Sequence, residues 1–231
     1  MENKGVLQKI KAGLIVSCQA LRNEPLHGSR YMGRMALAAK EGGAVAIRAN
    51  SPEDIEEIKK TVDLPVIALH KVEYPDSEIY ITPTLKEVDA LCRVGADIIA
   101  IDATQRLRPG SQTLEAFFTQ VRQKYPNQLF MADTSCFEEG LKAQLLGFDL
   151  VGTTMSGYTS YTKGSPLPNY SLMRRYVEAL NIPVIAEGGI WSPEQLKEAL
   201  NTGVWAAVVG TAITRPQEIT RRFVKAISVH G

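Results

Sequence analysis

The stretch that decides the fold is Gly95-Ala96-Asp97-Ile98-Ile99-Ala100-Ile101-Asp102. A glycine precedes a short run of Ile and Ala, and an aspartate follows it. An apolar run that does not alternate with polar residues is typical of a strand buried on both faces, as in a parallel sheet covered by helices. We therefore predict a strand at residues 97–101. Seven similar runs predict strands at residues 14–17, 44–47, 65–69, 129–132, 150–152, 183–186 and 206–209.

Signals for helix starts lie between these apolar runs. The segments at residues 51–54 and 192–195 read SPED and SPEQ, with Ser at the N-cap and Pro at the first helical position. Each has an acceptor three residues after the cap, which is the spacing of a capping box. The same spacing occurs in two further pairs, Thr84 with Glu87 and Ser135 with Glu138. The predicted order is therefore strand, helix, strand, helix.

A repeat of glycines supports this order. Gly43, Gly95, Gly147 and Gly203 are 52, 52 and 56 residues apart, and each stands just before a predicted strand. Glycine is favoured at the end of a helix because it adopts the left-handed C′ conformation. Each interval holds one further strand, so eight strand–helix units fit in 231 residues. We predict an α/β fold, a TIM (β/α)8 barrel that forms a single domain over residues 1–231.

A doubly wound open sheet is the alternative architecture. It would place a GxGxxG turn after its first strand. The chain reads CQALRNE at residues 18–24, directly after the first predicted strand, so the barrel is favoured.

Composition excludes several classes of protein. There are 26 Lys and Arg against 25 Asp and Glu, a net charge of +1, which argues against a nucleic-acid partner. The three cysteines are widely spaced and odd in number, as expected for free thiols in a reducing compartment. The apolar stretch near the N-terminus is too short for a signal sequence or a membrane span. We expect a soluble cytoplasmic protein with no membrane partner.

Polar residues follow the predicted strands, and a barrel collects its catalytic groups at those strand ends. The first polar residues after the runs are Gln19, Arg48, His70, Lys71, Asp102, Asp133, Thr153, Thr154 and Glu187. Burial at the barrel mouth would lower the pKa of Lys71 and make it a base or an amine nucleophile, with Glu187 as an acid or base. The alternatives are that strand ends are polar because the chain emerges into water there, or that Lys71 and Glu187 only form an ion pair.

The glycines after the last two strands predict an anion site. Gly188, Gly189 and Gly210 expose backbone N–H groups in the loops where barrels bind phosphate, and Arg48 and Arg215 add charge. The alternative is that these glycines only form tight turns. The three histidines have no metal-binding spacing, so we expect no metal site. Two other segments remain open: residues 156–164 form either a lid or a surface loop, and residues 106–111 can be a solvated turn.

The chain resembles the N-acetylmannosamine-6-phosphate 2-epimerase family of bacterial amino-sugar and sialic-acid catabolism. The resemblance runs from about residue 14 to residue 216. It rests on LIVSCQ at 14–19, IRA at 47–49, YITPT at 80–84, ADIIAIDAT at 96–104 with Arg106, Arg108 and Pro109, MAD at 131–133, GYTSYT at 157–162, AEG at 186–188 and VVGTAITRP at 208–216.

The resemblance implies a TIM barrel that interconverts N-acetylmannosamine 6-phosphate and N-acetylglucosamine 6-phosphate, without a cofactor and as a homodimer. It implies that Lys71 is the catalytic base, that Glu187 matches the family's glutamate, and that Asp133 matches its aspartate. Gln19, Arg48 and Arg215 match contacts to the substrate and its phosphate. One position departs from the family, because Val72 stands where a basic residue is expected after the lysine.

Epimerisation at C2 requires ring opening and then removal of the C2 hydrogen as a proton. Lys71 would take this proton, and Glu187, Asp133 or a substrate hydroxyl would return one to the other face. Two other functions stay open from the residues alone. One is a phosphosugar aldolase or lyase in which Lys71 forms a Schiff base. The other is a non-catalytic sugar-phosphate binding protein.

Overall fold

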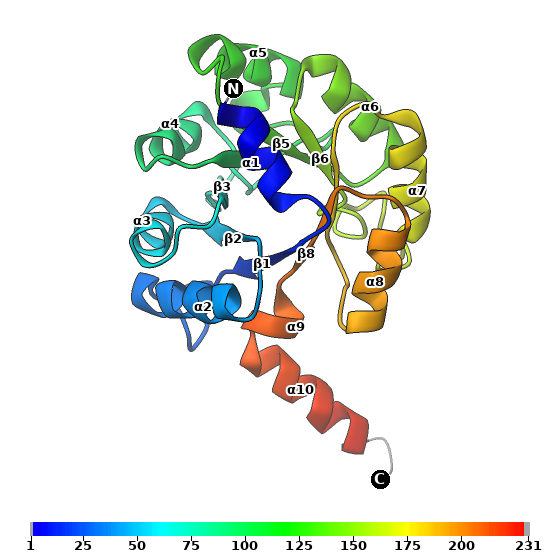
Figure 1. The fold of residues 1–231 in the computed structure, drawn as a ribbon. Coiled ribbons are helices and arrows are strands. Elements are labelled where there is room, and N and C mark those ends of the chain that lie inside the picture. The colour runs from blue at the N-terminus through cyan, green and yellow to red at the C-terminus, as the bar shows by residue number, and fades with distance from the viewer. Residues whose placement is uncertain (1, 229–231) are drawn as a thin grey trace.

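In the computed structural model, which describes residues 2–228, eight parallel strands close into a barrel surrounded by helices (Figure 1). Each strand pairs with its neighbours in sequence, and β8 pairs with β1. The strands are β1 (Leu14–Cys18), β2 (Ala46–Asn50), β3 (Val66–Leu69), β4 (Ile98–Asp102), β5 (Leu129–Asp133), β6 (Leu150–Gly152), β7 (Val184–Ala186) and β8 (Ala206–Val209). The predicted TIM barrel is confirmed.

Helices follow the strands and cover the outside of the barrel. They are α2 (Ser29–Glu41), α3 (Pro52–Thr61), α4 (Leu85–Arg93), α5 (Leu114–Lys124), α6 (Phe137–Leu146), α7 (Tyr170–Ala179) and α8 (Pro193–Asn201). A 3-10 turn, η1 (Pro109–Ser111), precedes α5, and β8 is followed by α9 (Thr211–Thr214) and α10 (Pro216–Ile227). None of the helices in this described part of the chain combines the length and the apolar character that a bilayer crossing needs.

The predicted caps are confirmed with one exception. Ser51 and Ser192 accept hydrogen bonds from the backbone three residues on, and Thr84 forms a capping box with Glu87. The prediction of Ser135 with Glu138 is wrong by one residue, since the N-cap is Cys136 and the capping carboxylate is Glu139. Ser135 still donates its hydroxyl to Glu139 at 2.8 Å, so the same carboxylate serves both residues.

Two apolar cores result from the alternation of side chains along each strand. The outer core lies between the strands and the helices and is the larger of the two. The inner core fills the barrel with Ile15, Ala46, Ile67, Ile98, Met131, Ile185 and Val208. α1 (Glu2–Ile10) lies across the end of the barrel where the strands begin (Figure 1), and Ile10 joins the inner core. α1 therefore covers that end of the barrel, and the cavity described below lies at the carboxyl end of the strands.

Candidate active site

The polar residues of the mouth continue the inward-facing series of each strand. Side chains two residues apart on a strand share a face, and Ala46 faces the inner core. Arg48 therefore points inward, and it lies within β2 rather than after it, because the strand runs to Asn50. The same step of two leads from Leu69 to Lys71, from Met131 to Asp133 and from Ile185 to Glu187. The fold thus directs these polar groups toward one axis.

A cavity of about 360 Å³ lies at this end of the barrel. It brings together most of the residues that the sequence predicts for the site. Those that line it are Gln19, Arg48, Lys71, Glu187, Gly188, Gly210 and Arg215. Asp133 does not line it, and its side chain is fully buried beneath Arg48.

Arg48 binds two carboxylates at once. Its Nη2 lies 2.5 Å from Asp133 Oδ2, and its Nη1 lies 3.1 Å from both Asp133 Oδ1 and Glu187 Oε2. Thr154 Oγ1 also donates to both carboxylates, at 2.7 Å to Asp133 and 3.2 Å to Glu187. Burial alone would lower the pKa of Arg48, but the charges of Asp133 and Glu187 outweigh it and raise that pKa above its ordinary value. Arg48 is therefore a permanent cation.

Glu187 differs from Asp133 in being partly accessible, since its side chain is 16% exposed. Burial raises the pKa of Glu187, and the Arg48 charge opposes that rise. A carboxyl group of this kind can hold a proton and still reach a molecule in the cavity. Glu187 thus combines a raised pKa with access to the cavity, which Asp133 does not line.

Lys71 is a buried amine without a carboxylate partner. Burial, followed by the nearby Arg48 charge, lowers its pKa from 10.5 to about 8. Among the side chains that the structure describes, those of residues 5–228, no carboxylate oxygen lies within 4.0 Å of its Nζ. Glu187, the expected partner, is bound to Arg48 instead. The interpretation of Lys71 and Glu187 as a simple ion pair is therefore wrong, and with a pKa of about 8 roughly a tenth of the amine is uncharged at pH 7.

The loops after β7 and β8 form the other side of the cavity. Gly188 and Gly189 adopt φ of 108° and 72°, in the region that favours glycine. A Cβ on Gly189 would also lie 2.5 Å from the Leu167 Cβ. Arg215 lies at this side of the cavity, and its Nε donates to Glu24 at 2.7 Å. Backbone N–H groups next to an arginine are suited to an anion such as phosphate.

Glu24 and Tyr80 line the cavity and were not singled out from the sequence. Tyr80 lies within the YITPT motif, which was the available signal. Gln19 donates its Nε2 to Ser17 at 2.9 Å, while its buried Oε1 has no hydrogen-bond partner in the described chain. Tyr158, in the segment left open as a lid or a surface loop, also lines the cavity.

A second and larger cavity, of about 1070 Å³, adjoins the first. Both are lined by Leu21, Lys71 and Tyr80. His70 and Val72 line only the second cavity, so the departure at Val72 lies outside the pocket that holds the charged cluster.

Comparison with known proteins gives close matches over nearly the whole chain. Residues 32–229 match the NanE family, described as putative N-acetylmannosamine-6-phosphate epimerase. A protein of Caldanaerobacter subterraneus described as a putative N-acetylmannosamine-6-phosphate 2-epimerase is 55% identical over 222 residues, covering 96% of this chain and 94% of its own. One of Clostridioides difficile with the same description is 54% identical, covering 97% of this chain and 100% of its own.

Solved structures agree with these matches. The N-acetylmannosamine-6-phosphate 2-epimerase of Clostridium perfringens superimposes with a TM-score of 0.91 and 52% identity, covering 95% of each chain. A thiamine phosphate pyrophosphorylase of Pyrococcus furiosus gives a TM-score of 0.60 at 24% identity, covering 98% of this chain and 100% of its own. The second match shares the fold alone.

Proposed function

This chain belongs to the N-acetylmannosamine-6-phosphate epimerase family, and we propose that it interconverts N-acetylmannosamine 6-phosphate and N-acetylglucosamine 6-phosphate with Lys71 as the base. The reaction is a step of amino-sugar and sialic-acid catabolism. The observation that carries the proposal is the buried Lys71 amine, whose pKa is lowered to about 8 and which has no carboxylate partner among the described side chains.

Lys71 removes the C2 proton of the ring-opened sugar. The neutral amine takes the proton and becomes an ammonium, while the electron pair of the C–H bond moves toward the C1 oxygen and leaves an enolate. The Arg48 guanidinium, which stays charged, is the cation beside the reacting groups. A cation fixed in place before the charge develops stabilises that charge without reorganisation.

Glu187 returns a proton to the opposite face of C2. Its raised pKa favours a protonated carboxyl group, and it reaches the cavity, whereas Asp133 is fully buried and bound to Arg48. After inversion Lys71 holds an extra proton and Glu187 has lost one, and exchange with water restores both. We assign Asp133 the role of holding Arg48 in place. Each well-placed acid or base is worth about 10²–10⁴-fold in rate.

The remaining residues of the cavity hold the substrate. Gly188 and Gly210, with Arg215, bind the phosphate through backbone N–H groups and the guanidinium. The unpartnered Oε1 of Gln19 accepts a hydrogen bond from a hydroxyl or the amide N–H of the sugar. A phosphate anchored at this side of the cavity fixes the distance of C2 from Lys71, which makes the proton transfer effectively intramolecular.

Proton NMR of N-acetylmannosamine 6-phosphate in D2O tests the function. We expect N-acetylglucosamine 6-phosphate to appear with deuterium at C2. Lys71→Ala should abolish both the product and the exchange while leaving the circular dichroism spectrum and the Tm near those of the wild type. Near-normal turnover in this variant would remove Lys71 from the role of base. Cleavage of the carbon chain with a borohydride-trapped adduct would instead indicate a Schiff-base lyase.

We also propose that the protein forms a homodimer. α10 extends away from its own barrel (Figure 1), and none of its residues is buried. Phe223, Val224 and Ile227 on this helix are 72%, 53% and 76% exposed. A contiguous set of exposed apolar side chains marks a contact with another surface, and a second copy of the chain is the occupant that the family suggests. The three free cysteines support a reducing, cytoplasmic location.

A further inference from the structure

Lys71 lies on a short two-stranded arm, residues 70–83, between β3 and α4. Lys71 pairs with Ile81 in an antiparallel bridge, and the chain reverses around Tyr74 and Ser77. Val72 N donates to Tyr80 O at 3.0 Å, and Thr82 N donates to His70 O at 2.8 Å. The arm projects from the barrel after only four residues of β3. Whatever holds the arm therefore also fixes the place of the Lys71 backbone.

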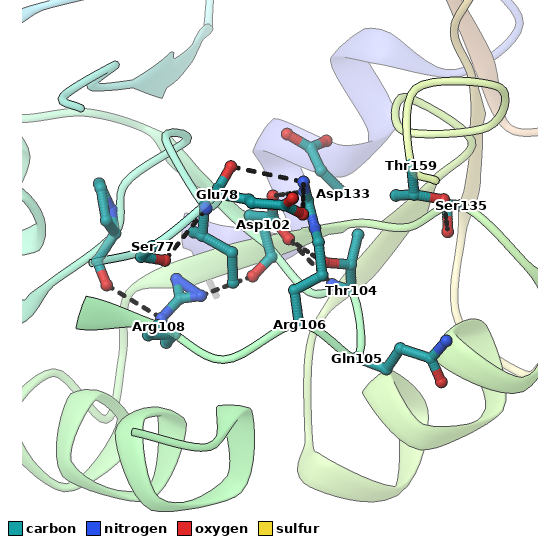
Figure 2. Close-up of polar contacts among 12 residues, drawn as sticks. Ser77, Glu78, Asp102, Thr104, Gln105, Arg106, Arg108, Asp133, Ser135 and Thr159 are labelled. Carbon is teal, nitrogen blue, oxygen red and sulfur yellow. Dashed lines mark hydrogen bonds and ion pairs between the residues drawn. The ribbon is translucent and has the colours of Figure 1, made fainter. Parts of the chain in front are cut away.

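Residues 102–110, from the end of β4 onward, hold the arm along its length. Two further bonds hold it elsewhere: Asn50 Oδ1 accepts from Lys71 N at 2.7 Å, and Glu87 Oε1 accepts from Tyr74 Oη at 3.0 Å. Near the tip, Gly110 N donates to Asp76 Oδ2 at 2.8 Å, and Ser77 Oγ donates to Leu107 O at 2.8 Å. Farther along, Arg106 Nη1 donates to Glu78 O at 3.4 Å. At the base lies Arg108, which Figure 2 shows beside Asp102. It donates from Nη2 to Thr82 O at 2.9 Å and from Nε to Pro83 O at 3.0 Å. The interpretation of residues 106–111 as a solvated turn is wrong for both arginines.

The two guanidinium groups are fixed by β4 itself. Arg106 Nη2 lies 2.7 Å from Asp102 Oδ2, and Arg108 Nη1 donates to Asp102 O at 2.7 Å. Arg108 is 1% exposed and its guanidinium carbon lies 4.0 Å from the centre of the Phe117 ring. It bonds three backbone carbonyls with one rigid fork, which the single ammonium of lysine does not reproduce. Burying a cation on backbone oxygens alone is costly, and burial lowers the pKa of Arg108 to about 10.

We propose that Arg106 and Arg108 are positioning residues for the epimerase: they fix the arm of residues 70–83 to the end of β4 and so keep the Lys71 amine inside the cavity. The proposal rests on the proposed function, in which Lys71 is the base. Neither arginine lines the cavity with the charged cluster. Their effect on the reaction is therefore exerted through the arm and not by contact with the substrate.

Burial of Lys71 is the property that the arm controls. The charged groups that face the amine come from other elements: Arg48 from β2, Asp133 from β5, Glu187 after β7 and Arg215 before α10. If the arm loosens, the amine gains water and its pKa moves from about 8 toward 10.5. At pH 7 the neutral fraction then falls from about 9% to as little as about 0.03%, a loss of up to about 300-fold in available base.

The test compares Arg108→Lys with Arg122→Lys. Arg122 makes bonds of the same kind at the opposite end of the barrel, to Asp149 at 2.7 Å and to the backbone oxygens of Gln128 and Gly147 at 2.8 Å. Both variants keep the charge and lose the fork, so both should lower the Tm. Only Arg108→Lys should raise the pKa of Lys71.

The readout is the titration of Lys71 in the full-length protein without substrate. Brief acetylation by acetic anhydride between about pH 6 and 11 labels neutral amines, and peptide mass spectrometry reports the Lys71 fraction. We expect an inflection near 8 in the wild type and in Arg122→Lys, and one higher by about one unit or more in Arg108→Lys. At pH 7, kcat/KM of Arg108→Lys should fall at least about tenfold. The acid limb of its kcat/KM profile should shift to higher pH by the same amount as the inflection of the Lys71 labelling curve.

A second variant keeps the test decisive if Arg108→Lys does not fold. Asp76→Ala combined with Ser77→Ala removes the two bonds that join the tip of the arm to Leu107 and Gly110. It also removes the bond from Ile79 N to Ser77 Oγ, and it leaves no buried charge unpaired. It should shift the Lys71 inflection in the same direction by a smaller amount. If Arg108→Lys or the double variant folds and its Lys71 titration curve keeps the wild-type inflection, the proposal is overturned. If Lys71 of the wild type titrates near 8 but the protein does not epimerise the substrate, the proposed function is overturned and the positioning role of Arg106 and Arg108 is not.

Discussion

Glu187→Gln separates the two proton transfers that inversion requires. The amide has nearly the shape of the carboxyl group, so it can still accept from Thr154, which bonds Glu187 at 3.2 Å. The variant cannot deliver a proton to C2. Lys71 is untouched and can still remove the C2 proton and return a solvent deuteron to the same face. We therefore expect deuterium to enter C2 of recovered N-acetylmannosamine 6-phosphate while the epimer hardly forms.

The size of each effect follows from the site. Loss of a placed acid lowers the rate of inversion by about 10²–10⁴-fold. Exchange should stay near the wild-type rate, because the amide carries the same charge as the protonated carboxyl group and leaves the pKa of Lys71 at about 8.

The assay is one NMR time course in D2O, with mass spectrometry of the recovered substrate. Thr211→Ser serves as a control for a mild change at the rim of the same cavity, since Thr211 lines it and, within the described chain, makes no hydrogen bond to Arg48, Lys71 or Glu187. Wild-type inversion in Glu187→Gln would show that another group is the acid. If exchange and inversion fell together by the same factor, Glu187 would be needed before the C–H bond breaks, as in ring opening.

Three further outcomes follow from the site and the surface. Arg215→Ala should raise KM for the phosphorylated sugar by about tenfold or more, because it removes a phosphate contact. It should also move the acid limb of kcat/KM to higher pH, because the Arg215 charge lowers the pKa of Lys71. An unchanged KM in steady-state kinetics would place the phosphate elsewhere. Arg48→Met should cost about 3–5 kcal/mol in urea unfolding by leaving Asp133 buried and unpaired, and adding Asp133→Asn should restore part of that loss. Phe223→Glu should convert a dimer to a monomer in light scattering while unfolding of the barrel is unchanged, and a dimer that persists would place the contact away from α10.

The strands and the main site residues could be predicted from the sequence because a barrel buries each strand on both faces. The apolar runs locate the strands, and the step of two from an inner-core residue leads directly to Lys71 or Glu187 at the mouth. Side-chain partners were less accessible to prediction. Arg215 and Glu24 are 191 positions apart and carry no shared motif. Arg108 bonds backbone carbonyls, which every residue possesses, so nothing in the neighbouring sequence marks it as buried.

Arg48 explains how a lysine near two carboxylates can keep a lowered pKa. Alone, Glu187 and Asp133 would attract the Lys71 ammonium and raise its pKa, which is the direction in which both charges act. Arg48 binds both carboxylates and is itself a like charge that lowers the Lys71 pKa. The carboxylates are thereby satisfied by a guanidinium that does not lose its proton, and the amine is left desolvated without a partner. The chemistry of Lys71 thus depends on a cation placed on the neighbouring strand β2 as much as on its own burial.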